Sequence, residues 1–256
     1  THFDASKFKT QFACEVKDFD PSGLMDRKEI RKCDRYTLLA IGSSEEAIKD
    51  SKLDFENENC DRIGVIFSAG IGGIKTFEEE VAYYYTHEDM GPKFNPFFIP
   101  KMISDIAAGL ISIRHGLRGP NFGTVSACAS STHSSIIAFD QIRLGKADVM
   151  VVGGAEAAIT PAGVGGFNAM TALSTRNDSP QTASRPFSKS RDGFVIGEGS
   201  ACLIFEELEH ALARGAKIYA EVVGGGMSAD AYHLTASHPE GLGAKLVMKN
   251  ALEDAH

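Results

Sequence analysis

The amino-acid sequence predicts an α/β protein in which helices cover both faces of a parallel sheet. Three short runs, at 63–67, 122–127 and 148–154, are rich in β-branched and small residues, which is typical of buried strands. Apolar residues recur at helical spacing between these runs. Strand and helix therefore alternate along this part of the chain, which is the order that a parallel sheet with crossover helices requires.

The segments before the first strand are an irregular stretch at 1–18 and one or two helices at 26–49. Gly42 is the position at which such a helix could break. The early face of these helices, from Arg27 to Arg35, is strongly basic. A basic run of this kind is usually a solvated helix face, and the local residues favour that interpretation.

A glycine-rich turn at 68–73 follows the first strand. Such a turn can hold a phosphate, but it has neither the P-loop spacing nor the complete dinucleotide-binding spacing. We therefore interpret it as a place of close backbone packing beside a site.

Helices are predicted at 77–85 and 99–115, and a loop at 91–100 joins them. The loop contains Pro and three phenylalanines. Aromatic side chains in a loop need an apolar environment, which a core, a second subunit or a ligand can provide.

The stretch from Gly119 to Ser131 places Cys128 where the predicted strand at 122–127 turns into a helix. Hydroxyl side chains from Ser130 onward can cap that helix, and its apolar pattern continues to Gly145. The N–H groups and dipole of a helix start favour an anion, so a thiol here should ionise more readily and find an oxyanion site beside it. The pattern fits a covalent nucleophile. A buried structural cysteine is the alternative.

The rest of the chain continues the alternation of elements. We expect, in order, a central strand at 148–154, a Gly- and Ala-rich segment at 160–173, a polar loop at 174–190, strand character at 194–205, a helix at 206–214, a strand at 218–223 and a final helix at 241–254. The length of 256 residues suits one large domain or part of a larger one.

The composition excludes several classes of protein. A net charge of −8 argues against a nucleic-acid-binding surface. Five widely spaced cysteines, an odd number without a C-x-x-C pair, indicate a reducing compartment rather than a disulfide framework. We find no apolar run long enough for a membrane span and no signal-peptide pattern, and we expect a cytoplasmic protein.

The histidines matter because a thiol nucleophile normally works beside a base. His133 follows Cys128 by five residues, roughly 140° round a helix, so we expect it to pack or to form a hydrogen bond away from the thiol. His233 and His238 lie in a loop without convincing further ligands, which disfavours a metal site. We expect no metal and no cofactor, and we find no obvious catalytic base.

Motifs spread along the whole chain occur in a definite order. They are GLRGP at 116–120, SACAS at 126–130, ADVMVVGGAE at 147–156, GVGGF at 163–167, ALSTRND at 172–178, RDGFVIGEG at 191–199 and SADAYH at 228–233. Together they resemble the β-ketoacyl-acyl-carrier-protein synthases, the condensing enzymes of fatty-acid synthesis, and most closely the type II long-chain elongating enzymes. This resemblance favours the nucleophile interpretation of Cys128.

The resemblance implies a thiolase-like fold, a layered α/β/α/β/α arrangement of two similar halves with mixed sheets, of which this chain supplies mainly the N-terminal half. It also implies a homodimer. In the family, the matching cysteine takes an acyl chain from acyl carrier protein, malonyl-carrier is decarboxylated, and the resulting carbanion attacks the thioester. The resemblance therefore implies acyl carrier protein, carrying acyl and malonyl groups, as the partner. Nucleic acid and membrane are not expected as partners, because of the net charge and the lack of a long apolar run.

The resemblance also implies roles for individual residues. Cys128 matches the nucleophile, and its own N–H would be one oxyanion donor. The acyl pocket would be walled by Ile71 and Phe167, and closed by Phe98 and Ile99 of the neighbouring subunit. The surface that meets the acidic carrier protein would be formed by Lys28, Arg31 and Lys32, with a contribution from Lys93.

Several departures limit what the resemblance implies. The family's first strand would precede residue 1, and its two catalytic histidines, its active-site lysine and a glycine-rich oxyanion loop would lie beyond His256. We therefore interpret 1–256 as a β-ketoacyl synthase N-terminal domain incomplete at both ends, and expect the isolated piece to be inactive in condensation. Thr171 stands where relatives often carry an arginine that holds carrier protein.

Three alternatives remain at this point. A polyketide-type ketosynthase shares many of the motifs, and a thiolase would use free coenzyme A thioesters without decarboxylation. The isolated chain could also be a non-catalytic module that docks carrier protein.

Overall fold

The computed structural model describes residues 2–256 and contains a mixed four-stranded sheet. The strands are β1 (Ile63–Ser68), β2 (Asn121–Phe122), β3 (Val149–Glu156) and β4 (Gly199–Glu206), in the spatial order β2-β1-β3-β4. β1 runs parallel to β2 and β3, whereas β4 pairs antiparallel to β3, with Glu156 opposite Gly199. The predicted α/β class is confirmed. The strands predicted between residues 63 and 154 are parallel as expected, and the antiparallel β4 makes the sheet mixed, as the resemblance implies.

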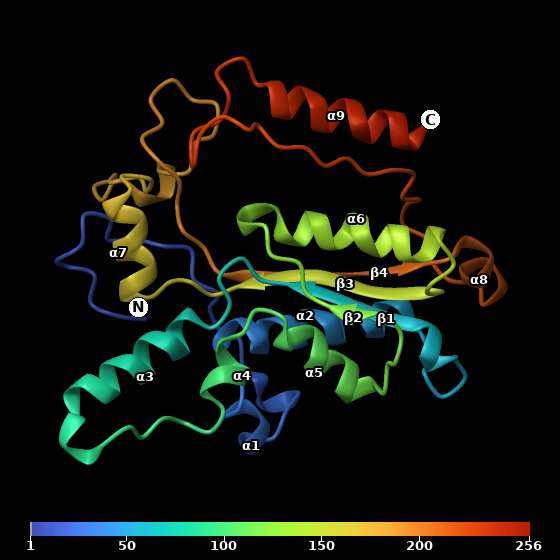
Figure 1. Ribbon diagram of the computed structural model, residues 1–256, viewed down its shortest axis with the longest axis horizontal. Helices are drawn as coiled ribbons and strands as arrows, with labels where there is room; N and C mark the ends of the chain where they lie inside the picture. The colour runs from blue at the N-terminus through green and yellow to red at the C-terminus, as the bar shows by residue number, and fades with distance from the viewer. Residues whose placement is uncertain (1) are drawn as a thin grey trace.

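Helices cover both faces of the sheet (Figure 1). α6 (Ser130–Arg143) lies on one face, and α2 (Arg35–Ser51) and α5 (Ile106–His115) lie on the other. Alternate residues of the central strands enter different cores, as the strand period of two requires. Val65 and Phe67 join the α2–α5 core, whereas Ile66 joins the core beneath α6. Burial on both faces explains why the sequences of the two central strands, β1 and β3, are continuous apolar runs.

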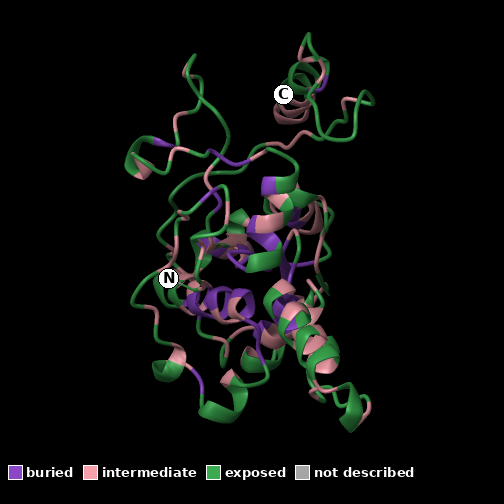
Figure 2. Cartoon of the chain, turned by 90° about the vertical axis from the view of Figure 1, so that its left-hand side faces the viewer, coloured by how far each residue is buried: buried purple, intermediate pink, exposed green. Residues whose placement is uncertain are grey.

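The remaining helices surround this centre, and Figure 2 shows that buried residues concentrate in the sheet and the helices packed on it. The α-helices are α1 (Arg27–Ile30), α3 (Ile74–Thr86), α4 (Phe98–Met102), α7 (Pro161–Ala169), α8 (Leu208–Ala213) and α9 (Leu242–Ala255). Short 3-10 helices occur at η1 (Pro21–Gly23), η2 (Cys60–Arg62), η3 (Glu88–Met90), η4 (Ala127–Ala129) and η5 (Pro180–Thr182). Among residues 2–256, no helix combines the length and the apolar content needed to cross a membrane.

The predicted helical region at 26–49 forms two helices, α1 and α2. Asp26 and Glu29 form a capping box on α1, and Asp34 caps α2 by accepting a hydrogen bond from the Tyr36 N–H. Gly42 does not interrupt α2. A Cβ at this position would lie 2.8 Å from the Phe19 ring. The glycine therefore allows that ring to pack closely against α2.

The prediction of a single helix at 99–115 is wrong, because the helix is interrupted between α4 and α5. Ile103 adopts an extended conformation with ψ of 139°. The Tyr36 hydroxyl, from α2, donates a hydrogen bond to the Ile103 carbonyl, which supplies the break with a partner that local sequence cannot reveal.

Two predicted strands differ from the structure. The run at 122–127 contributes only Phe122 to β2, which is an edge strand, and Phe122 is partly exposed instead of buried. The segment at 218–223 forms no regular strand and pairs with none in the described part of the chain, and Tyr219 in it is exposed. The stretch at 194–205 becomes regular strand only from Gly199.

Candidate active site

The turns that follow β1 and β3 and the segment after β2 meet at the carboxyl end of the parallel strands. This edge of an α/β sheet is the usual location of a binding site. Cys128 lies in η4, between β2 and the first residue of α6, and its side chain is exposed. The predicted strand-to-helix junction is therefore looser than expected, because an irregular segment at 123–126 and the 3-10 turn η4 separate β2 from α6.

A hydroxyl network holds the start of α6 against the end of β1. Ser68 Oγ lies 2.9 Å from Thr124 Oγ1 and 2.5 Å from Ser134 Oγ. The Thr124 hydroxyl donates to the Ser130 carbonyl at 2.9 Å, and the Thr124 N–H donates to Ser68 Oγ at 2.8 Å. These bonds join β1, the segment after β2 and α6, so they fix the position of the turn between them.

The turn that carries Cys128 has an uncommon backbone conformation. Ala127 has φ of +50°, in the left-handed region that non-glycine residues rarely adopt. The Ser130 hydroxyl holds the turn by donating to the Ala127 carbonyl at 2.7 Å and accepting from the Ser126 N–H at 2.9 Å. Strain of this kind costs about 1–3 kcal/mol and persists where surrounding contacts enforce it, often at functional sites.

The other cysteines include two whose environment suppresses reactivity. Burial raises the pKa of Cys33 to about 11 and that of Cys202 to about 12. A thiol is nucleophilic only after ionisation, so these two are poor nucleophiles near neutral pH. Cys128 and Cys14 are the two exposed cysteines.

His133 forms a hydrogen bond within the same turn, as its spacing from Cys128 predicts. Its Nδ1 lies 2.7 Å from Ser126 Oγ. The loop histidines behave similarly, because His233 Nδ1 accepts from the backbone N–H groups of Thr235 and Ala236. Within residues 2–256, no three His, Cys, Asp or Glu side chains are grouped so as to hold a metal ion.

Ile71 lies on the glycine-rich turn after β1, next to a carboxylate that the sequence interpretation missed. The Ile71 N–H donates to Glu156 Oε2 at 2.9 Å. Burial raises the pKa of Glu156, against the opposing effect of backbone N–H groups from the turn. The available sequence signal was a charged residue ending an apolar strand, in the Gly-Gly-Ala-Glu run.

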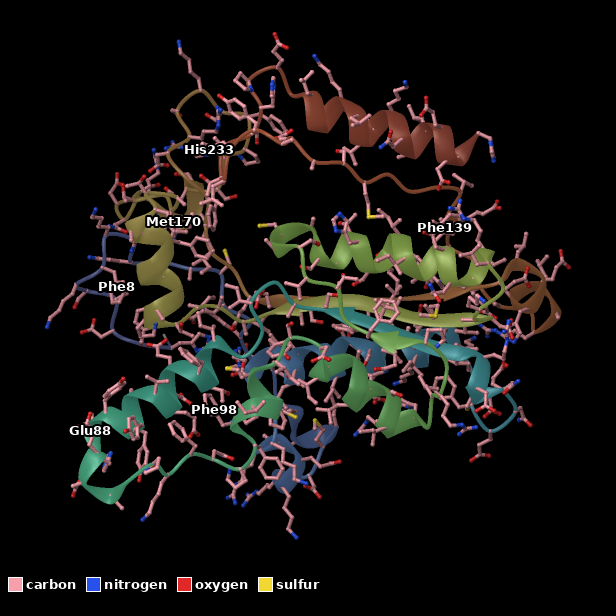
Figure 3. The ribbon with its side chains drawn as sticks, in the orientation of Figure 1. Phe8, Glu88, Phe98, Phe139, Met170 and His233 are labelled. Carbon is pink, nitrogen blue, oxygen red and sulfur yellow. The ribbon has the colours of Figure 1, made fainter. Side chains whose placement is uncertain are left out.

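Phe98 and Ile99 lie at the start of α4, beside α3 (Figure 3). The Phe98 ring stacks on Phe94 at 5.5 Å and on Phe77 at 6.3 Å between centroids. Ile99 remains 56% exposed, and Phe97 is also exposed. The aromatic loop therefore packs partly on itself and leaves an apolar surface uncovered in the described chain.

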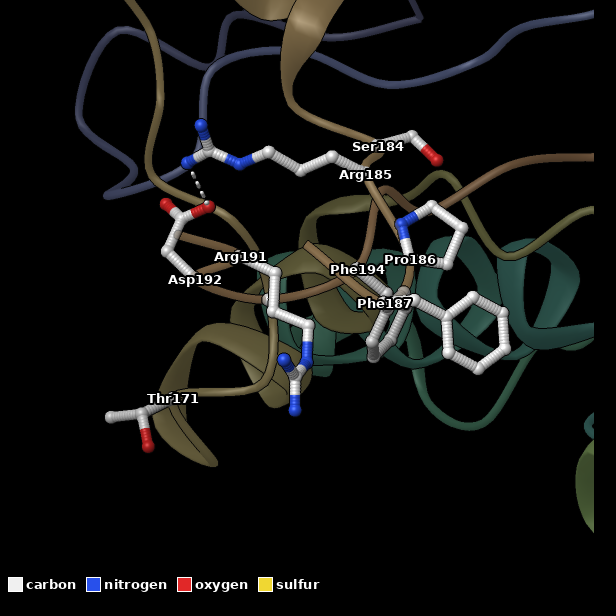
Figure 4. A pocket seen from close by; sticks show the side chains of 9 residues that line it. Thr171, Ser184, Arg185, Pro186, Phe187, Arg191, Asp192 and Phe194 are labelled. Atoms are coloured by element: carbon white, nitrogen blue, oxygen red, sulfur yellow. Dashed lines mark hydrogen bonds and ion pairs between the residues drawn. The ribbon is translucent and has the colours of Figure 1, made fainter. Parts of the chain in front are cut away.

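Phe167 lies in α7 and forms an edge-to-face pair with Phe194 at 5.2 Å between centroids. Phe194 lines an open cavity of about 800 Å³ together with Thr171 and two arginines, Arg185 and Arg191 (Figure 4). Asp192 forms an ion pair with Arg185 in this cavity. Cys128 is not among its lining residues.

The basic residues of the predicted docking surface are exposed. Lys28 lies in α1, Arg31 and Lys32 directly follow it, and Lys93 lies in the aromatic loop. The Lys32 ammonium lies 5.4 Å from the centroid of the Phe97 ring, a cation–π contact that joins the basic segment to the aromatic loop. The structure thus brings the basic and aromatic surfaces together.

Comparison with known proteins assigns the fold and the motifs to one family. The model of the β-ketoacyl synthase N-terminal domain matches residues 2–211. The chain belongs to the β-ketoacyl synthase family. It is 50% identical over all of its length to 3-oxoacyl-[acyl-carrier-protein] synthase 2 of Coxiella burnetii, of which it spans 61%.

Solved structures agree with this membership. A β-ketoacyl synthase from Burkholderia phymatum has a TM-score of 0.88 and 34% identity, over 98% of this chain and 62% of that one. A type II polyketide synthase acyl-carrier protein in complex with its ketosynthase has a TM-score of 0.82 and 29% identity, over 98% of this chain and 61% of that one. The thiolase-like fold class expected from the motifs is therefore confirmed.

Proposed function

We propose that the protein is a 3-oxoacyl-acyl-carrier-protein synthase of fatty-acid elongation, in which Cys128 is the acyl-accepting nucleophile. The observation that carries this proposal is the exposed thiol on a strained turn at the start of α6. The 50% identity to a 3-oxoacyl-[acyl-carrier-protein] synthase 2 supports fatty-acid elongation over the polyketide and thiolase alternatives.

In the first step, the Cys128 thiolate attacks the carbonyl carbon of an acyl-carrier thioester. A bond forms between Sγ and that carbon, the bond to the carrier sulfur breaks, and the carrier leaves as a thiol after taking a proton. N–H groups in the first turn of a helix have no carbonyl partner within the helix. The Cys128 N–H, at such a position, is a donor for the oxyanion of the tetrahedral intermediate.

In the second step, malonyl-carrier loses CO2, and the resulting carbanion attacks the acyl carbonyl on Cys128. The new C–C bond forms and the bond to Sγ breaks, with its electron pair remaining on sulfur, which regenerates the Cys128 thiolate. We assign this decarboxylation to a part of the family's length that the chain does not span, since it covers 61% of its Coxiella burnetii relative.

The carrier protein docks on the basic segment formed by Lys28, Arg31 and Lys32, with Lys93 beside it. These side chains are exposed, so their charge is available to an acidic partner. The neighbouring ketosynthase structure with its acyl-carrier protein supports a partner of this class.

The acyl pocket is walled by Ile71 and Phe167, and a second copy of the chain contributes Phe98 and Ile99. The support for a homodimer is the uncovered apolar surface of the aromatic loop, which includes Phe97 and Ile99. The five free thiols support a reducing compartment, and we place the protein in the cytoplasm, without a metal or cofactor.

The test is condensation by the full-length protein supplied with a long-chain acyl-carrier and malonyl-carrier. We expect 3-oxoacyl-carrier and CO2 from the wild type and no condensation product from Cys128→Ser. Product formation by Cys128→Ser at the wild-type rate would contradict the proposal.

A further inference from the structure

Glu156 occupies the point where the turn after β1 meets the turn that carries Cys128. Its Oε2 accepts a hydrogen bond from the Ile71 N–H at 2.9 Å. A Cβ added to the neighbouring Gly70 would lie 3.0 Å from the same oxygen and 3.2 Å from the Ala127 carbonyl oxygen. The carboxylate, the Ile71 peptide and the peptide that precedes Cys128 therefore pack around one glycine.

The other side of the same turn is held by the segment that carries Phe98 and Ile99. The Gly73 N–H donates to the Met102 carbonyl at 3.0 Å, and a Cβ on Gly73 would lie 2.2 Å from the Lys101 carbonyl oxygen. The turn is thus clamped between Glu156 and the end of α4. The position of Ile71 depends on both contacts.

Retaining a carboxylate at this point is costly. Glu156 Oε1 is buried and has no hydrogen-bond partner in the described part of the chain. A buried polar atom without a partner destabilises a fold, and an apolar side chain of similar size would avoid that cost. What an apolar side chain cannot provide is the acceptor for the Ile71 N–H.

We propose that Glu156 is a positioning residue for acyl transfer, which fixes the Ile71 turn against the Cys128 turn and thereby sets which acyl chains fit the pocket. This inference rests on the proposed function for its substrate, an acyl thioester. Glu156 acts through the backbone of Ile71, so it does not touch the reacting atoms.

The test compares Glu156→Leu and Glu156→Gln in the full-length protein. Acylation rates of Cys128 are measured with C8, C12 and C16 acyl-carrier thioesters. Leucine removes the acceptor, so we expect the ratio of the C16 rate to the C8 rate to change about tenfold, the scale on which pocket shape discriminates chain length. Glutamine keeps an acceptor oxygen, and we expect it to restore the wild-type ratio within about twofold.

The matched control is Glu198→Leu, which removes a buried carboxylate that also accepts a backbone hydrogen bond, from the Val16 N–H. This control should lower the unfolding temperature and leave the chain-length ratio unchanged. If Glu156→Leu lowers the acylation rates of all three chain lengths by the same factor, the positioning role is refuted. It is also refuted if Glu156→Gln alters the ratio of the C16 rate to the C8 rate as much as Glu156→Leu does.

Hydrogen exchange separates this inference from the proposed function. In the absence of substrate, the Ile71 amide should exchange at least about tenfold faster in Glu156→Leu than in the wild type or Glu156→Gln, because its acceptor is lost. Equal exchange in all three proteins would overturn the positioning role even if acylation occurs. A wild type that accepts no acyl group, but shows this pattern of exchange, would refute the proposed function and leave the contact between Glu156 and the turn supported.

Discussion

Arg35 and Glu198 form a two-point ion pair that joins the start of α2 to the segment before β4. Arg35 Nε donates to Oε2 at 2.8 Å and its terminal nitrogen donates to Oε1 at 2.6 Å. The Glu198 side chain is only 1% exposed. Its Oε1 also accepts the Val16 N–H at 3.0 Å, so one buried carboxylate holds the N-terminal segment, α2 and the approach to β4 together.

Replacement of Arg35 by leucine should therefore be strongly destabilising. It leaves a buried carboxylate with reduced pairing, and we expect a loss of about 3 kcal/mol of unfolding free energy at pH 7, measured by urea denaturation. The matched control is Arg62→Leu, which breaks a more exposed pair with Asp148 and should cost clearly less than Arg35→Leu, because solvent screens an exposed pair. Equal losses in the two variants would contradict the account.

The Glu198 carboxylate should also make the unfolding free energy depend on pH in the acid range. Burial alone would raise the pKa of Glu198, but hydrogen bonds from Arg35, His2 and Val16 outweigh it and lower the pKa below the ordinary 4.5. Its contribution is fully present above that ordinary value and is lost as the pH falls through the lower folded pKa. In Glu198→Gln this component of the acid dependence should disappear. An unchanged slope of unfolding free energy against pH below 4.5 would count against it.

His210 should produce the opposite dependence near neutral pH. Its ring lies between Glu206, at 2.6 Å, and Glu58, at 3.0 Å, while Arg214 also pairs with Glu206. Burial opposes protonation, yet the two carboxylates outweigh it and raise the pKa of His210 above 6.5. The stabilisation is present below pH 6.5 and is lost as the pH rises through the folded pKa.

The measurement is the unfolding free energy between pH 6 and pH 8.5. We expect the wild type to lose stability over this range and His210→Ala to lose less. His233→Ala, whose ring bonds to the backbone of its own loop, is the control and should retain the wild-type slope. A wild-type slope in His210→Ala would rule out the assignment.

Carrier recognition should depend on the basic segment. The charge reversals Lys28→Glu, Arg31→Glu and Lys32→Glu, made together, should raise the KM for acyl-carrier by about tenfold and leave kcat little changed, because they lie on the surface and not at the thiol. Lys245→Glu, an exposed position on α9, is the matched control. A fall in kcat without a change in KM would argue against a docking role.

Local sequence predicts those parts of the fold whose environment is the same on every side. The strands β1 and β3 are buried on both faces, and their apolar runs identify them. Phe122 lies on an edge strand, which depends on where distant segments pair. The break at Ile103 depends on Tyr36, which is 67 residues away in the chain.

In the candidate site, too, local sequence predicts some features, whereas others depend on contacts with distant residues. Cys128 is visible in the sequence because a strand-to-helix junction is a local pattern. Glu156 is not, because the N–H that it accepts belongs to Ile71, 85 residues earlier. The apolar pattern at 218–223 also misled the interpretation, since a strand requires a partner as well as a suitable sequence.

Acyl transfer to Cys128 is measured by the intact mass of the protein before and after incubation with a long-chain acyl-carrier thioester, followed by peptide mapping. We predict a gain of one acyl group, located on Cys128, which is absent in Cys128→Ser and retained in Cys14→Ser, the variant of the other exposed cysteine. An acyl group found on Cys14, or an unmodified Cys128 in a folded full-length protein, would contradict the account.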